Sequence, residues 1–224
     1  MYLSKISIVP SAHSAGELAK LSRKGVYASH QLIWNLFTED EKRTFLYREE
    51  QSLGSGRPLF YVLSQSKPDL NVPLFDIQSK EFSPKLKAGQ RLAFKLRVNP
   101  TVCLTDEAGK RRRHDVLMHA KYQAKRTGTA SDEISGLMDQ AALNWISDEK
   151  RLSAWGVTLD VLPEIERYTQ HRSQKKCGPV IRFSSVDFHG MLMVSDPQTF
   201  CRQYAQGFGR AKALGCGLML IRPV

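Results

Sequence analysis

Alternating hydrophobic and polar residues mark several strands in the first hundred positions. Residues 2–9 and 90–99 carry apolar side chains at every second position, which is the pattern of a strand with one buried face. Residues 44–48 and 59–63 are two further strand-like runs, and the glycine-containing stretch 53–58 between them predicts a hairpin loop. The first half of the chain therefore predicts four strands.

A helical spacing of apolar residues follows the first strand. Val26, Ile33, Leu36 and Phe37 fall on one side of a helix, so residues 27–37 predict an amphipathic helix. Residues 68–84 are interrupted by three prolines and resist assignment, and we expect only a short helix there. The first half then reads β-α-β-β-(short α)-β.

The second half repeats this order of elements. Strand-like runs occupy residues 101–104, 156–168, 180–194 and 218–221, and helices are predicted over residues 131–147 and 196–206. Two such units in tandem predict an α+β fold of two ferredoxin-like (RRM-like) domains, each an antiparallel sheet with helices on one face. We place the N-terminal domain at residues 1–99 and the C-terminal domain at residues 100–224.

The chain carries a large surplus of positive charge, with 33 Lys and Arg against 22 Asp and Glu, or a net charge of +11. Such a surplus favours a polyanionic partner, and nucleic acid before a membrane surface. Between residues 110 and 126, the basic segment, seven bases face the single acid Asp115: Lys110, Arg111, Arg112, Arg113, Lys121, Lys125 and Arg126. A solvated surface is the alternative interpretation, but no acidic residues alternate with these bases to pair with them. We therefore predict that the basic segment contacts nucleic acid.

The composition also limits other classes of protein. With 42% hydrophobic and 25% charged residues, the chain is globular rather than disordered. No apolar run approaches the ~20 residues of a membrane span, and the first five residues lack the features of a signal peptide, so we expect a cytoplasmic protein with no membrane partner. Cys103, Cys177, Cys201 and Cys216 form no CxxC pair, so we expect free, mostly buried thiols and no cysteine-bound zinc.

A run of glycines near the C-terminus, the glycine segment (residues 207–217), marks backbone that turns sharply or approaches something closely. It contains Gly207, Gly209, Gly215 and Gly217, with Arg210 and Lys212 among them. Backbone N–H groups and two cations suit an anion such as a phosphate chain, and the alternative is a tight turn before the last strand. The segment is not a Walker loop, because no Gly-Lys-Ser/Thr follows at the required spacing.

His30 has the most suggestive setting of the six histidines. Tyr27 lies three residues before it, so the two rings are neighbours on a helix. An imidazole exchanges protons near neutral pH, and a tyrosine hydroxyl orients a group or donates to it. The alternative is a hydrogen-bonded core histidine, since His30 falls among Val26, Ile33 and Phe37 on the apolar side.

Metal-dependent nuclease chemistry has little support in the sequence, which contains no DxD or HExxH motif and no paired carboxylates at metal-binding spacing. RNA carries its own nucleophile, the 2′-hydroxyl. Cleavage then needs a base, an acid and donors for the charged phosphorane, which a His, a Tyr and a few cations supply. We therefore expect no metal and no small-molecule cofactor.

Four segments spread along the chain are distinctive: MYLSK at residues 1–5, YASHQLIWNLF at 27–37, FKLRVNP at 94–100 and, most specific, GFGRAKALGCGL at 207–218. Together they resemble the CasE (also called Cse) family of CRISPR-associated endoribonucleases, the repeat-processing subunits of type I-E Cascade.

The resemblance implies two ferredoxin-like domains that bind the stem-loop of a CRISPR repeat RNA. It implies a single cut at the 3′ base of the stem, without metal, that leaves a 2′,3′-cyclic phosphate on an RNA that stays bound beside the other Cascade subunits. On matching positions, His30 would be the general acid or base and Tyr27 its partner. The glycine segment would lie near the RNA backbone, and the basic segment would grip the stem. The alternatives are a non-catalytic RNA-binding module, a scaffold subunit, or a small-molecule transferase at the glycine segment.

Overall fold

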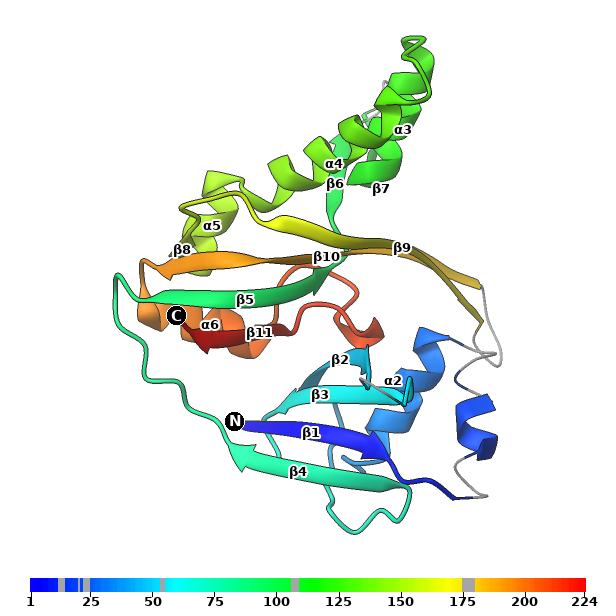
Figure 1. The fold of residues 1–224 in the computed structure, drawn as a ribbon, viewed down its shortest axis with the longest axis vertical. Coiled ribbons are helices and arrows are strands. Elements are labelled where there is room, and N and C mark those ends of the chain that lie inside the picture. The colour runs from blue at the N-terminus through cyan, green and yellow to red at the C-terminus, as the bar shows by residue number, and fades with distance from the viewer. Residues whose placement is uncertain (12–14, 20, 22–24, 53–54, 106–108, 175–179) are drawn as a thin grey trace. The chain divides into compact units, whose positions relative to one another are not determined.

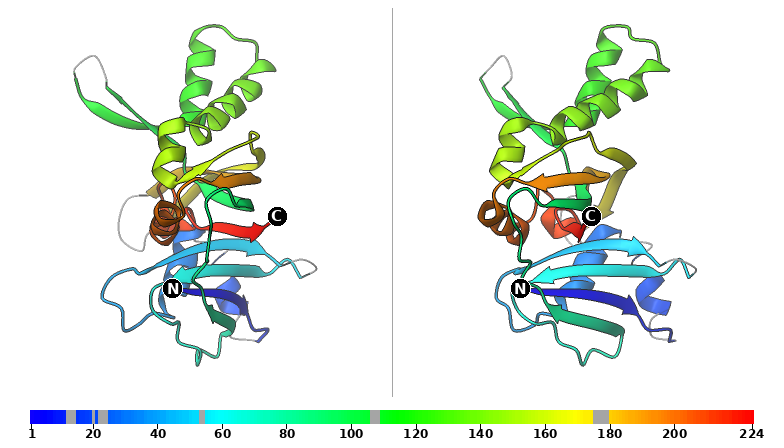
Figure 2. Two further views of the ribbon diagram at one scale, coloured as in Figure 1. Left: turned by 90° about the vertical axis from the view of Figure 1, so that its left-hand side faces the viewer. Right: turned by 60° about the vertical axis from the view of Figure 1, so that its left-hand side comes forward.

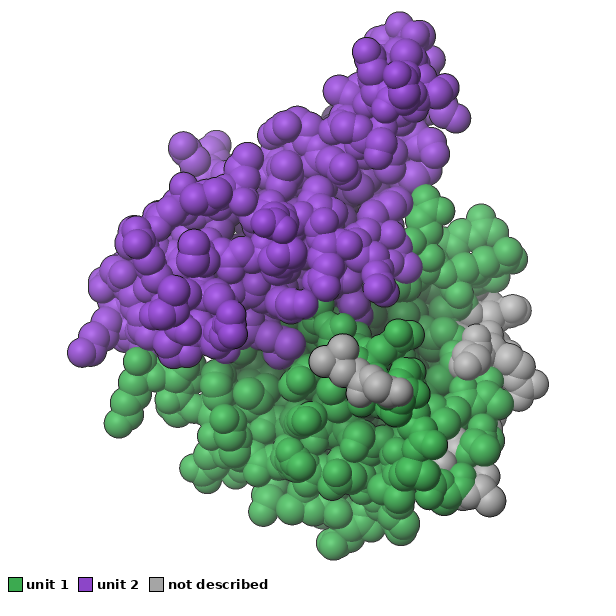
Figure 3. Space-filling view, viewed as in Figure 1, with its two compact units in different colours: residues 1–85, 170–182, 204–218 green, residues 86–169, 183–203, 219–224 purple. Residues whose placement is uncertain are grey.

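The structure is a computed structural model that describes all residues except 12–14, 20, 22–24, 53–54, 106–108 and 175–179. The chain forms two compact units, which Figure 3 shows in separate colours. Unit 1 comprises residues 1–85, 170–182 and 204–218, and unit 2 comprises residues 86–169, 183–203 and 219–224. The chain therefore passes between the units several times. The domain boundary placed between residues 99 and 100 stays a prediction, because these units describe compactness and not repeats of a fold.

Unit 1 is built on a four-stranded antiparallel sheet (Figure 1). Its strands are β1 (Tyr2–Ile8), β2 (Phe45–Gln51), β3 (Pro58–Ser64) and β4 (Phe75–Glu81), in the order β2-β3-β1-β4. The register sets Ile6 of β1 opposite Phe60 of β3 and Ile77 of β4. The strands predicted at residues 2–9, 44–48 and 59–63 are confirmed.

Helix α2 (Val26–Trp34) covers one face of this sheet (Figure 2). Leu32 and Ile33 are buried in one cluster with Ile6 and Phe60, so the helix and the sheet share a core. The helix ends at Trp34, three residues before the predicted end. Leu36 and Phe37 still reach the core, because the chain continues in a tighter turn in which the N–H of Leu36 donates to the carbonyl of Ile33 (3.1 Å).

The short helix expected within residues 68–84 is wrong. Strand β4 lies there, paired along the outer side of β1. Phe75 and Ile77 pack on the sheet core at the spacing of two that a strand requires. The prolines at positions 73 and 84 lie outside β4 and delimit it, which is why the stretch has no uniform pattern.

Unit 2 contains a second sheet in which the strands follow the same order. Its strands are β5 (Arg91–Val98), β8 (Val157–Thr158), β10 (Val180–Val194) and β11 (Met219–Pro223), in the order β11-β5-β10-β8, while β9 (Glu164–Gln174) also pairs with β10. Taken in chain order, the first and third strands are central and the second and fourth lie at the edges, as in unit 1. Two sheets of the same order confirm the predicted α+β, tandem ferredoxin-like fold class.

Three helices of the second half are α4 (Glu133–Ile146), α5 (Glu149–Trp155) and α6 (Pro197–Gln206). The helices expected at residues 131–147 and 196–206 are confirmed, whereas α5 was not predicted. The side chain of Asp148 caps α5 by accepting from the N–H of Arg151 (2.9 Å), and Gly156 ends it in the left-handed conformation. The strand expected over residues 156–168 is therefore divided between β8 and β9.

The basic segment forms two elements that its charges did not reveal. Strand β7 (Arg111–Asp115) pairs with β6 (Thr101–Thr105) in a separate two-stranded sheet, and helix α3 (Val116–Arg126) follows at once. The Asp115 carboxylate accepts from the N–H of Met118 (2.7 Å) and so caps α3. Leu117 and Ala124 are buried, and α3 packs against α4.

The glycine segment folds closely on itself. Gly217 has φ of 87°, and a Cβ added there would lie 2.7 Å from the carbonyl oxygen of Phe208. The N–H of Phe208 donates to the carbonyl of Gly217 at 2.9 Å. Only glycine allows both this backbone conformation and this approach. The segment therefore forms the tight turn that was the alternative interpretation of its sequence. The short helix η1 (Lys212–Leu214) lies within this turn.

The same segment passes around the edge strand β2. A Cβ on Gly207 would lie 2.7 Å from Leu46 Cδ1, and one on Gly215 would lie 3.4 Å from Tyr47 Cε2. Leu46 and Tyr47 are consecutive in a strand and point to opposite faces of the sheet. The glycine segment therefore contacts both faces of the sheet at this edge.

Two general expectations can be compared with the described residues. No helix among them is long and apolar enough to cross a membrane. Cys103, Cys201 and Cys216 form no disulfide among the described residues; Cys216 is buried, Cys201 is half-buried and Cys103 is exposed on β6, so the thiols are less buried than expected, and Cys177 lies outside the described residues.

Replacement of Gly217 by alanine is expected to destabilise the protein by about 1–3 kcal/mol, because the new Cβ meets backbone at a positive φ. Gly136 is the matched control: it lies in α4 with no atom within 4 Å of an added Cβ, so Gly136→Ala should stabilise by about 0.4–1 kcal/mol. Urea unfolding of both variants measures the difference. Equal midpoints for Gly217→Ala and the wild type would contradict the packing described here.

Candidate active site

His30 lies on α2 within a ring of aromatic side chains in unit 1. The distances from its ring centroid are 6.5 Å to Tyr27, 5.6 Å to Trp34, 5.9 Å to Phe45 and 6.4 Å to Tyr47. The side chain is half-buried, not sealed in the core. Helix α2 supplies two of these rings and strand β2 the other two, so secondary structure on both sides fixes the orientation of the imidazole.

The surroundings of His30 favour its neutral form. Burial lowers the pKa of the imidazole, and the positive charge of Arg43 lowers this pKa further. The Nδ1 atom is buried and finds no hydrogen-bond partner among the described residues. His30 is therefore a neutral imidazole near pH 7, ready to accept a proton.

Two contacts hold the first turn of α2, which carries Tyr27. The N–H of Tyr27 donates to the hydroxyl of Ser173 at 3.3 Å, and the hydroxyl of Tyr47 donates to the carbonyl of Val26 at 3.0 Å. Gly25 precedes the helix and has no side chain to cap it, so Ser173 supplies the acceptor that an N-cap residue would normally give. The position of Tyr27 beside His30 thus depends on a residue far along the chain.

Cations gather beside this ring. The guanidinium of Arg43 donates to the carbonyl of Phe45, and the Lys212 ammonium donates to the carbonyl of Gln206 at 2.8 Å. Both side chains are half-buried. Burial lowers the pKa of Lys212, and the charges of Arg43 and Arg210 lower it further. Helix η1, which carries Lys212, contacts both α2 and β2. Like charges held this close favour the binding of an anion.

The structure therefore brings together one group of the residues predicted from the sequence. His30, Tyr27, Arg210, Lys212 and the four glycines of the glycine segment all belong to unit 1. Gly207, Gly215 and Gly217 are buried and Gly209 is half-buried, so packing explains them directly. Their contact with RNA stays a prediction.

The other group lies in unit 2, on β7 and α3. Lys121 is half-buried, and the remaining bases of the basic segment are exposed: Lys110, Arg111, Arg112, Arg113, Lys125 and Arg126. Their contact with RNA also stays a prediction. Within the part of the chain that the structure describes, no three His, Cys, Asp or Glu side chains form a group that could hold a metal ion.

Sequence reasoning missed Arg43 and Tyr47. Arg43 stands in the mixed-charge run Glu-Asp-Glu-Lys-Arg at residues 39–43, which is typical of a solvated loop. Tyr47 lies in a predicted strand, where an aromatic residue is ordinary. Neither position carries a local signal, because both reach His30 only through the packing of β2 against α2.

Comparison with known proteins identifies a family and relatives for this chain. The sequence matches the family described as CRISPR associated protein over residues 1–223. It is 28% identical over 229 residues to the CRISPR system Cascade subunit CasE of Escherichia coli (strain K12), with all of both chains covered. It is 26% identical over 233 residues to the CRISPR-associated endoribonuclease Cse3 of Thermus thermophilus, again with all of both chains covered.

A comparison of structures finds the same group of proteins. A solved structure of the CRISPR endoribonuclease Cse3 bound to a 19-nucleotide RNA superposes with a TM-score of 0.71 at 25% identity, and all of both chains is covered. Sequence and structure agree over the whole length of the chain. The chain therefore belongs to the family of CRISPR-associated proteins, in the group that contains CasE and Cse3.

Proposed function

We propose that this chain is the endoribonuclease that processes CRISPR repeat RNA, with His30 as its central catalytic residue. Relatives matched over their whole length are named as an endoribonuclease and as a Cascade subunit, and one solved relative is bound to RNA. The observation that carries the assignment of the site is the half-buried imidazole of His30, which lies beside Tyr27 and is held neutral by burial and by Arg43, whose charge also acts on Lys212.

The reaction needs no nucleophile from the protein. The 2′-oxygen of the ribose attacks the adjacent phosphorus while the bond from phosphorus to the 5′-oxygen breaks. The 2′-hydroxyl gives its proton to a base, and the leaving 5′-oxygen takes one from an acid. The products are a 2′,3′-cyclic phosphate and a free 5′-hydroxyl. We place the cut at the 3′ base of the repeat stem.

His30 is suited to the first of these proton transfers. Its lowered pKa favours the neutral ring at pH 7, which is the form that can accept a proton. Because Nδ1 is buried, we assign Nε2 to the 2′-hydroxyl, in the neutral tautomer that carries its proton on Nδ1. Tyr27, held by the contacts of the first turn of α2, orients the same phosphodiester or supplies the second proton.

Arg43 and Lys212 supply the charge that the transition state requires. The phosphorane carries more negative charge than the phosphodiester, and donors already fixed in place stabilise it without reorganisation. Both side chains are held by backbone carbonyls, those of Phe45 and Gln206. Both keep donor hydrogens beyond these bonds, since a guanidinium has five and an ammonium three.

Binding depends on a different set of charges. The basic segment presents its exposed arginines and lysines from β7 and α3, which suits the phosphates of an A-form stem. The RNA stays bound after the cut, and the protein then takes its place among the other subunits of Cascade, as the Escherichia coli relative does by name.

Replacement of His30 by alanine is expected to lower the cleavage rate by about 10²–10⁴-fold, because the base is lost. Affinity for the repeat stem-loop should stay within about twofold, since the basic segment is untouched. Single-turnover cleavage and filter binding measure the two quantities. His189→Ala, a half-exposed histidine of β10 paired with Glu164 (3.1 Å), is the control and should cut normally. If the wild type bound the stem-loop but did not cleave it, the chain would be a non-catalytic RNA-binding module.

Cleavage is expected to continue in excess EDTA, because the protein groups and the 2′-hydroxyl complete the reaction. A repeat RNA with a single 2′-deoxy nucleotide before the cut should bind normally and remain whole. Mass spectrometry of the product should show the 2′,3′-cyclic phosphate. Loss of activity in EDTA, or a cut in the deoxy substrate, would sink the 2′-hydroxyl mechanism.

Replacement of Arg43 by glutamine tests the electrostatic coupling. The value of kcat/KM, which reports groups of the free enzyme, should rise with pH as His30 loses its proton, with a midpoint below the ordinary histidine pKa of 6.5. Removal of the Arg43 charge raises the pKa of His30, so this acidic limb should move to higher pH. Lys42→Gln, an exposed neighbour with the same change in net charge, should not move it. Tyr27 and Tyr47 also face the ring, and both stay unchanged in this comparison. Equal pH profiles for the two variants would show that the charge of Arg43 does not act on the pKa of His30.

A further inference from the structure

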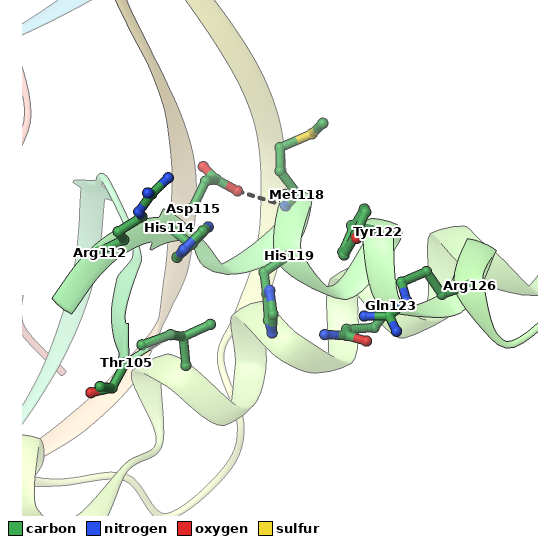
Figure 4. Close-up of a pocket in the computed structure, with 10 residues that line it drawn as sticks. Thr105, Arg112, His114, Asp115, Met118, His119, Tyr122, Gln123 and Arg126 are labelled. Atoms are coloured by element: carbon green, nitrogen blue, oxygen red, sulfur yellow. Dashed lines mark hydrogen bonds between the residues drawn. The ribbon is translucent and has the colours of Figure 1, made fainter. Parts of the chain in front are cut away.

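A hollow in unit 2 lies along the basic segment and contains none of the residues assigned above to catalysis. Its volume is about 790 Å³, and its walls come from β6, β7 and α3 (Figure 4). The side chains that matter for its chemistry are Arg112, His114, His119, Tyr122, Gln123 and Arg126. We call this hollow the β7–α3 pocket.

The fold gives the β7–α3 pocket a fixed frame. Arg112 and His114 are two residues apart on β7 and share one face of the β6–β7 hairpin. His119 and Gln123 are four residues apart and point to the same side of α3 (Figure 4). The rings of His114 and His119 lie 5.8 Å apart across the junction of strand and helix. Asp115 caps α3 at this junction and so sets its direction.

The lining offers flat rings and hydrogen-bonding groups together. Tyr122 is 57% exposed, although large aromatic side chains are usually buried, and the guanidinium of Arg126 lies 5.7 Å from its ring centre. His114, His119 and Gln123 supply donors and acceptors. Rings combined with such groups are what an unstacked nucleobase requires, because its faces stack while its edge forms hydrogen bonds.

The charges of the lining fit a ribonucleotide better than a free base. Arg112 and Arg126 stand at different places in the lining, on β7 and near the end of α3. The one acid among the described lining residues, Asp115, is engaged by the first turn of α3, where helix N–H groups offset its charge.

A duplex stem does not need such a hollow. Paired bases hide their faces inside the stack, and a stem presents phosphates and 2′-hydroxyls to a protein. Exposed cations alone would suffice for it, and the basic segment has several outside the pocket, such as Lys110 and Arg111. The exposed ring of Tyr122 and the two histidines are therefore unexplained by stem binding.

We propose that the β7–α3 pocket binds an unpaired nucleotide of the repeat RNA that flanks the stem. Its base stacks on Tyr122 and contacts His119 and Gln123, and the neighbouring phosphates bind Arg112 and Arg126. The proposal rests on RNA being the ligand of this protein, as proposed above, and it adds a contact for single-stranded RNA. The competing occupant is a segment of another Cascade subunit.

The test compares a bare stem-loop RNA with the same stem-loop extended by six unpaired nucleotides on its 5′ side or on its 3′ side. A 2′-deoxy nucleotide at the cut site keeps all three RNAs whole. The wild type should bind one extended RNA roughly tenfold more tightly than the bare stem-loop. Tyr122→Ala should lose most of this gain and bind the bare stem-loop as the wild type does. Tyr122→Phe, which keeps a stacking ring, should retain the gain.

Leu162→Ala is the matched control, since Leu162 is 52% exposed in unit 2 and does not line the pocket. It should behave as the wild type with every RNA. Crosslinking of the extension, substituted with 4-thiouridine, should recover a peptide containing His119 or Tyr122.

Three results would overturn the proposal. One is an unchanged gain in Tyr122→Ala. Another is equal weakening on bare and extended RNA, which would assign the pocket to the stem. The third is normal RNA binding by Tyr122→Ala with loss of assembly into Cascade, which would assign the pocket to a protein. Failure of the proposed function would be distinguishable from these three results. The wild type would then neither bind nor cut a stem-loop that has its 2′-hydroxyl.

Discussion

The site in unit 1 depends on how closely the backbone of the glycine segment approaches its own turns and strand β2. Gly217 lies against the carbonyl of Phe208, and Gly207 lies against Leu46. These contacts leave no room for a Cβ, and they fix the loop that carries Lys212 beside β2 and α2. Residues near the two ends of the chain meet in one site for this reason. A side chain at either glycine would displace the cation before it disturbed the histidine.

Without a bound anion, the positive charges of this site destabilise one another. Arg43 disfavours both the protonated form of His30 and the charged form of Lys212. A phosphodiester relieves both effects, since its negative charge attracts the cations and stabilises imidazolium. In the proposed mechanism, binding of the phosphodiester would therefore favour the protonated form of His30. The ring would be neutral when it meets the 2′-hydroxyl, and the bound charge would then stabilise the proton that it accepts.

Local sequence patterns predicted the strands, helix and residue pair that depend on side-chain spacing within one element. Strands β1 and β5 and helix α2 follow from side-chain periodicity, and the pair Tyr27 and His30 follows from spacing on one helix. Arg43 could not be predicted, because its contact with His30 exists only after β2 pairs and packs. Strand β4 was hidden by the prolines that delimit it. Helix α3 was not predicted because its residues were interpreted by their charge alone, although Leu117 and Ala124 are seven positions apart and are both buried on its inner side.

The positive charges of the two units differ in their access to solvent, and this sets what each can do. Arg43 and Lys212 are half-buried in unit 1, where screening by salt is weak and a charge acts strongly on a neighbouring proton. The bases of β7 and α3 are mostly exposed, so salt weakens each of them, and their effect comes from number and spacing along a polyanion. Few buried charges suit chemistry at one phosphate, and many exposed charges suit the capture of an extended RNA. The net charge of +11 therefore does not show that the positive side chains of the two units differ in exposure.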